Sequence, residues 1–115
     1  MPDLDRLMEL PGALASFHFS DRGQLGDYRV ADGSPLEKNT LDMLCHMCVA
    51  NTCIGTMQAR GWEGLTGTKG FYPIEGFTLV GFEMSTVAVG NYGVVLRNED
   101  ADYQGAYDAL AGQAS

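Results

Sequence analysis

The fold is decided by residues 36–61, LEKNTLDMLCHMCVANTCIGTMQARG. Apolar residues recur there every three to four positions, which predicts an α-helix, the longest in the chain. The stretch also contains all three cysteines and one of the two histidines. We therefore expect the remaining elements to be arranged around this helix, and its cysteines and histidine are the first candidates for a functional site.

Shorter elements are expected on both sides of this helix. Residues 62–70 are expected to be loose, and Met84-Ser85 to form a turn. Residues 71–74 are strand-like, but Pro73 confines them to a sheet edge or to the entry of a strand. Asn98 or Asp100 is expected to cap the last helix. The predicted elements are helices at 3–10, 36–61 and 101–111, and strands at 13–20, 24–30, 77–83, 86–90 and 94–97. This order, α-β-β-α-β-β-β-α, predicts an α+β fold with an antiparallel sheet and helices packed on it.

Composition excludes several classes of protein. The 115 residues are enough for one domain, 1–115, with a single core. The formal net charge is −8 and the seven basic residues are scattered singly, so we expect no nucleic-acid partner. No apolar run is long enough for a membrane span, and the first ten residues are acidic, unlike a signal peptide. We therefore expect a cytoplasmic protein, without a disulfide framework.

The long helix carries two apolar stripes when its residues are placed 100° apart. One stripe consists of Leu41, Leu44, Cys45 and Cys48, and suits contact with the sheet. The second consists of Met43, Met47, Ala50, Ile54 and Met57. A helix with two apolar faces is covered twice, and a second copy of the chain is the simplest cover for the second face. The alternative is that both stripes merge into one wide core face.

The cysteine pattern invites a metal or redox interpretation, which helical geometry restricts. Cys45 and Cys53 lie eight residues apart, about 12 Å along a helix, so they cannot bind one ion. Cys45 with Cys48, or Asp42 with His46, have the spacing to share one. We predict no metal site and no cofactor. Buried structural thiols are the simplest reading, and redox use of Cys45, Cys48 or Cys53 is kept as an alternative.

Other catalytic signals are absent from the sequence. It contains no phosphate-binding loop, G-x-S-x-G motif or dinucleotide fingerprint, so we do not expect an enzyme. An aromatic group surrounds the glycine-rich segment: Trp62, Phe71, Tyr72 and Phe77. These side chains either line a groove for a small molecule or peptide, or cap the core.

The chain resembles the roadblock/LC7 superfamily, and within it an uncharacterised bacterial branch. The resemblance rests on the order of elements, on PGALASFHFSDRGQLGDYRV at residues 11–30 with its Asp-x-Gly hairpin, and on VAVGNYGVVLRN at residues 87–98. It implies a five-stranded antiparallel sheet, with the long helix on one face and the two terminal helices on the other. It also implies dimers in which middle strands pair across a two-fold axis and the long helices lie side by side.

Relatives of this kind act as scaffolds or regulators of small GTPases and motor proteins, without a catalytic centre. The resemblance therefore implies a homodimeric interaction protein, whose partner is a small GTPase or another protein. The glycine-rich segment at residues 62–76 and the cysteine-bearing helix depart from the family pattern. A cysteine-based redox or sulfur-handling accessory protein is the alternative function.

Overall fold

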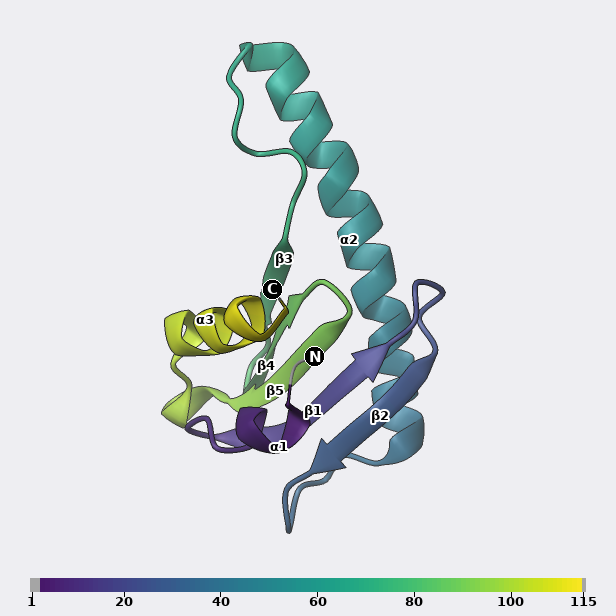
Figure 1. The fold of residues 1–115 in the computed structure, drawn as a ribbon, viewed down its shortest axis with the longest axis vertical. Helices are drawn as coiled ribbons and strands as arrows, with labels where there is room; N and C mark the ends of the chain where they lie inside the picture. The colour runs from purple at the N-terminus through teal and green to yellow at the C-terminus, as the bar shows by residue number, and fades with distance from the viewer. Residues whose placement is uncertain (1–2, 115) are drawn as a thin grey trace.

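The long helix is present in the computed structural model, which describes residues 3–114, and it is longer than predicted (Figure 1). Helix α2 spans Lys38–Thr66, 29 residues, or about 43 Å at 1.5 Å per residue. It continues through Gly61, where we expected it to end. Gly67 ends it instead, in a left-handed conformation (φ 71°) that glycine adopts without strain, and its N–H bonds to the Glu63 carbonyl oxygen.

The five expected strands form one antiparallel sheet in the order β2-β1-β5-β4-β3. Their bounds are β1 Ala13–Phe19, β2 Leu25–Val30, β3 Gly76–Val80, β4 Met84–Val89 and β5 Tyr92–Arg97. The prediction of a turn at Met84-Ser85 is wrong. These residues begin β4, where Ser85 pairs with Val80, and the reversal lies at residues 81–83.

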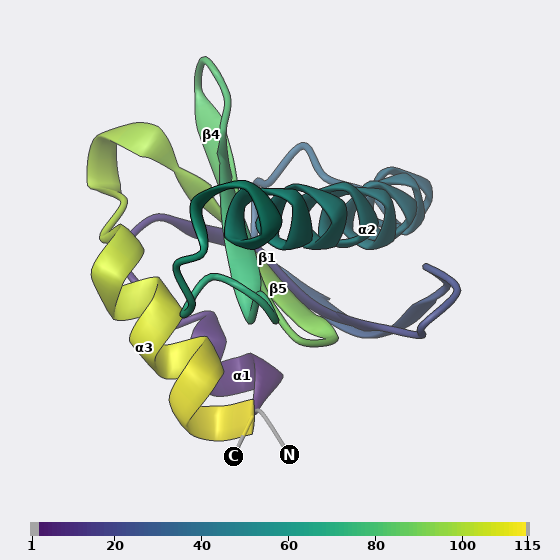
Figure 2. The same ribbon diagram turned by 90° about the horizontal axis from the view of Figure 1, so that it is seen from above.

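The helices cover the two faces of the sheet separately (Figure 2), as the resemblance implied. Helix α2 packs on one face, over a core that includes Phe17, Leu41 and Cys45. Helices α1 (Leu4–Leu7) and α3 (Tyr103–Ala114) pack on the other face, over a second core that includes Leu96 and Leu110. The α+β prediction is thus confirmed, and the three inner strands, β1, β5 and β4, are mostly buried on both faces.

Strand β1 lies between β2 and β5, and most of its side chains are buried on both faces of the sheet. Ser16 points to the α1 side and is fully buried, although it is polar. Its hydroxyl donates a hydrogen bond of 2.9 Å to the carbonyl oxygen of Leu4, which satisfies the group. This bond attaches the short helix α1 to the middle of the sheet.

The last helix begins later than predicted. A 3-10 turn at Asn98–Asp100 precedes it, and the carboxylate of Asp102 accepts a hydrogen bond from the backbone N–H of Gly105 at 3.0 Å. Asp102 therefore caps α3, rather than Asn98 or Asp100. Asn98 instead accepts a hydrogen bond from the Ser85 hydroxyl and donates one to the Gly81 carbonyl oxygen, so it connects β5 to the β3–β4 hairpin.

Candidate interaction surface

The second apolar stripe of α2 is exposed along its whole length. Met43, Met47, Ile54 and Met57 are 64%, 43%, 54% and 73% exposed, and Ala50 between them is exposed as well. Leu41, Cys45 and Cys48, by contrast, are buried against the sheet. The alternative in which both stripes merge into one core face does not fit this burial. Whether the exposed stripe is a dimer interface is not tested by the structure and stays a prediction.

Exposed apolar residues are confined to one continuous part of the chain. Among the described residues, every large apolar side chain that is strongly exposed lies between positions 43 and 82, on α2, on β3, on the segment between them or in the turn that follows β3. The members beyond the α2 stripe are Trp62, Leu65, Phe71, Leu79, Val80 and Phe82. Apolar area gathered in this way is typical of a surface that another molecule covers.

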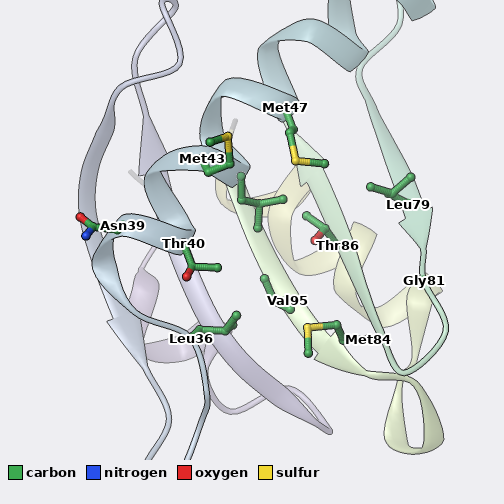
Figure 3. A pocket seen from close by; sticks show the side chains of 11 residues that line it. Leu36, Asn39, Thr40, Met43, Met47, Leu79, Gly81, Met84, Thr86 and Val95 are labelled. Carbon is green, nitrogen blue, oxygen red and sulfur yellow. The ribbon is translucent and has the colours of Figure 1, made fainter.

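An apolar groove of about 500 Å³ lies between the first half of α2 and strands β3, β4 and β5 (Figure 3). Met43 and Met47 line it from the helix, and Leu79 and Met84 line it from the sheet. We call it the N-terminal groove. No charged residue lines it. Flexible thioethers in such a groove adapt to an irregular apolar partner surface.

A second groove, of about 430 Å³, lies between the second half of α2 and the segment that leads into β3. We call it the C-terminal groove. Trp62, Phe71 and Phe77 line it together with Ile54 and Ile74, so three of the four aromatic residues singled out in the sequence do meet. Binding of a small molecule or peptide in the C-terminal groove stays a prediction.

The fourth aromatic residue, Tyr72, has a different position. The Arg60 guanidinium lies 4.6 Å from the centre of its ring and donates a hydrogen bond of 2.7 Å to its hydroxyl. The Glu63 carboxylate accepts hydrogen bonds from the backbone N–H groups of Phe71 and Tyr72, both at 2.8 Å. The bond from Tyr72, followed by that from Phe71, lowers the pKa of Glu63. These contacts hold the 67–75 segment against α2.

The two edges of the sheet differ in charge. Edge strand β2 carries Asp27 and Arg29, which form an ion pair, and Arg29 also pairs with Asp5 at 2.9 Å. Charges of this kind discourage pairing with another strand. Edge strand β3, Gly76-Phe77-Thr78-Leu79-Val80, carries none. Of the two edges, β3 is therefore the one suited to strand addition.

The direction of the hydrogen bonds in β3 identifies which of its backbone groups face outward. Gly81 N–H bonds to the Met84 carbonyl oxygen and Gly90 N–H to that of Glu75, so odd-numbered residues of β3 bond to β4. The N–H and C=O groups of Gly76, Thr78 and Val80 then point to the outer edge. In the described part of the chain, no strand pairs with that edge.

The three cysteines occupy two environments. Cys45 and Cys48 are buried, and the loss of hydration raises the pKa of each thiol to about 12. Both are therefore protonated near neutral pH, and a protonated thiol is a poor nucleophile. Cys53 is exposed. Redox use of the cysteines is not tested, but the burial restricts an accessible thiol to Cys53.

Two further expectations concern His46 and a membrane. His46 contacts the backbone carbonyl oxygen of Asp42 through Nδ1 at 2.7 Å, whereas the Asp42 carboxylate accepts from the Leu25 N–H at 3.0 Å. Asp42 and His46 therefore do not form the side-chain pair that a metal would need. Within residues 3–114, no group of three potential ligands is placed to bind a metal ion, and no helix is long and apolar enough to cross a membrane.

The sheet order and the division of helices between its faces define the roadblock/LC7 fold, and known structures agree. A roadblock/LC7 domain from Streptomyces avermitilis superposes with a TM-score of 0.75 at 9% identity, over 96% of this chain and 87% of that one. The gliding protein MglB from Thermus thermophilus gives 0.71 at 17% identity, over 96% and 84%. An MglB structure described as having a tetrameric arrangement gives 0.72 at 15%, over 96% and 82%.

The family itself is identified from the sequence. The family model described as "Uncharacterized conserved protein (DUF2173)" matches residues 3–112, and the chain belongs to this family. No curated protein sequence matches the chain. The structural similarities lie below 25% identity, so they establish the fold and leave the partner open.

Proposed function

We propose that this protein is a non-enzymatic, cytoplasmic homodimer that acts as an interaction scaffold, with residues 1–115 as its single domain. The observation that carries the proposal is that, in residues 3–114, the strongly exposed large apolar side chains are confined to positions 43–82. A second copy covers that surface when the two β3 edges pair and the two α2 helices lie side by side. Met43, Met47, Ala50, Ile54 and Met57 then lie at the interface.

The register of the β3 pair follows from the outward-facing backbone groups. A two-fold axis at Thr78 pairs Thr78 with Thr78 of the second copy, and Gly76 with Val80. This register uses every outward-facing residue of Gly76–Val80, whereas a shift in either direction leaves some unpaired. Strand addition of this kind satisfies backbone groups that otherwise bond only to water.

The experiment is sedimentation velocity of the wild type and two matched variants. We expect a wild-type dimer at micromolar concentration. Met47→Glu places a charge in the interface and should give a folded monomer, because an unpaired buried charge opposes association. Lys38→Glu places the same carboxylate on the same helix, away from the apolar stripe, and should remain dimeric. A monomeric wild type would refute the proposal.

The register has its own test in a Cys53→Ser background. Paired residues that exchange two hydrogen bonds have Cα atoms about 5.5 Å apart, within the range of a disulfide. Thr78→Cys should therefore yield a covalent dimer on mild oxidation. A dimer that is not cross-linked at position 78 would contradict this register while leaving dimerisation intact.

The finer proposal is that the dimer regulates a small GTPase or another partner protein. The resemblance to roadblock proteins supports this class of partner. The test adds the wild-type dimer and the Met47→Glu variant to a purified small GTPase from the same genome, and measures GTP hydrolysis and nucleotide release. We expect the wild-type dimer, and not the Met47→Glu variant, to change one of these rates. Unchanged rates with every small GTPase of that genome would contradict this proposal.

A further inference from the structure

The β3–β4 hairpin carries the most exposed large apolar side chain among the described residues. Phe82 lies at the tip of this hairpin and is 99% exposed. It lines a cleft together with Pro35, which precedes α2, and Met84, which begins β4. Full exposure of an aromatic ring is unfavourable for an isolated chain, and here it falls beside the uncharged edge of the sheet.

The C-terminal groove lies at the opposite end of the same edge strand. Ile54, Trp62, Phe71 and Ile74 line it, no charged residue does, and its volume of about 430 Å³ exceeds that of a phenylalanine side chain. The exposed faces of Trp62 (55%) and Phe71 (57%) show that the chain's own residues do not fill it.

The positions of the tip and the groove are related by the middle of β3. Thr78 is the central residue of Gly76–Val80, four positions after Ile74 and four before Phe82. When two antiparallel strands pair about Thr78, the 82 end of one copy is directed toward the 74 end of the other, each two residues beyond the paired strands Gly76–Val80. A two-fold interface is reciprocal, so each tip then approaches the other copy's groove.

We propose that Phe82 of each copy docks into the C-terminal groove of the other. This inference rests on the proposed homodimer and on the Thr78 register, and it adds a specific aromatic anchor at each end of the paired strands. Each anchor buries an otherwise exposed ring against Ile54, Trp62 and Phe71. Phe82 is then a determinant of which chains pair, because a partner without an aromatic tip leaves the groove empty.

Proximity can be tested by mixing two variants in the Cys53→Ser background, each with one introduced cysteine in addition to the buried Cys45 and Cys48. Ile74→Cys mixed with Phe82→Cys should give a disulfide-linked dimer. Neither protein alone should cross-link, since equivalent positions lie about 26 Å apart along the strands at 3.3 Å per residue. No cross-link in the mixture, when Thr78→Cys does cross-link, overturns the inference and leaves the homodimer standing. If neither the mixture nor Thr78→Cys cross-links and the wild type is a monomer, the proposed function is refuted instead.

Energetic importance can be tested with the intact groove, because Trp62 is the only tryptophan of the chain and lines it. Dilution of the wild type through its dimer dissociation should shift Trp62 emission to longer wavelength. Phe82→Ala should give the red-shifted emission even in the dimer and weaken dimerisation about tenfold or more. Leu65→Ala, the control, removes another exposed side chain (89%) that lines neither groove, and it should change dissociation less than about twofold. Equal behaviour of the two variants overturns the inference.

Discussion

The Glu63 carboxylate accepts a hydrogen bond of 2.8 Å from the backbone N–H of Tyr72, nine residues further along the chain. The same oxygen accepts from Phe71 at the same distance. One side chain on the last turns of α2 therefore organises the return of the chain toward β3 and shapes one wall of the C-terminal groove.

This contact predicts a pH-dependent segment. The hydrogen bonds lower the folded-state pKa of Glu63 below the ordinary value of 4.5, so their stabilisation is complete above pH 4.5 and is lost as the pH falls through the lowered folded pKa. Hydrogen exchange of the Phe71 and Tyr72 amides, corrected for intrinsic rates, should show protection at pH 6 and less at pH 3. Glu63→Gln should flatten this dependence. Equal protection of the wild type at both pH values would contradict the assignment.

Thiol accessibility gives a second prediction. In the native protein at pH 8, an alkylating reagent should modify Cys53 rapidly, while Cys45 and Cys48 react only after denaturation. Mass spectrometry of the labelled protein counts the modified sites. Because burial raises the folded pKa of the two inner thiols to about 12, their stabilisation is full below pH 9 and is lost as the pH rises toward 12. Rapid labelling of all three cysteines would disprove the packing.

A third prediction concerns Gly93 in β5, which packs against Phe17. A Cβ at position 93 would overlap the Phe17 ring, and that ring is fully buried. Gly93→Ala should therefore lower the free energy of unfolding by about 1–3 kcal/mol. The control is Gly64→Ala in α2, where a Cβ meets open space and the better helix former should add about 1 kcal/mol. Denaturant unfolding measures the free energy of both variants. An unchanged free energy of unfolding for Gly93→Ala would contradict the prediction and show that the core repacks around the added methyl group.

The fourth prediction concerns the attachment of α2 to β2. Asp42 accepts a hydrogen bond of 3.0 Å from the Leu25 N–H at the start of that strand. Asp42→Ala leaves this N–H without its partner and should cost about 1–3 kcal/mol of unfolding free energy. Asp42→Asn retains an acceptor oxygen and should cost much less. Similar losses for both variants, measured by urea unfolding, would assign the effect to charge instead of the hydrogen bond.

Local patterns in the sequence predict the elements that depend on periodicity. The 3.6-residue repeat places Leu41, Cys45 and Cys48 on the core face and leaves the methionine stripe outside, as the structure shows. The end of α2 was not predictable in this way. Gly61 is a poor helix former, and it lowers the stability of the helix. The hydrogen bonds from the Phe71 and Tyr72 N–H groups to the Glu63 carboxylate offset this loss. These two bonds form only after the chain has reversed beyond α2, so local sequence does not indicate them.

The candidate surface also combines features that local sequence predicts with features that depend on the folded chain. The exposed stripe follows from residues on one helix, so the sequence alone indicates it. The C-terminal groove joins Ile54 to Phe71 and Phe77 across a chain reversal, and only the folded chain reveals that Tyr72 lies outside it. The prediction of a turn at Met84-Ser85 was wrong for a related reason. The hydrogen bond from the Gly81 N–H to the Met84 carbonyl oxygen places the reversal at residues 81–83 instead.

Among the described residues, the strongly exposed large apolar side chains all fall within one uninterrupted stretch, positions 43–82. In the proposed homodimer, pairing preference would therefore reside in this one cassette of sequence, which is flanked by the segments that build most of the sheet and both terminal helices. Exchange of this cassette between two members of the family should transfer pairing preference in a single genetic step. Duplicated genes that diverge only within it would produce chains that sort into separate homodimers from one common scaffold.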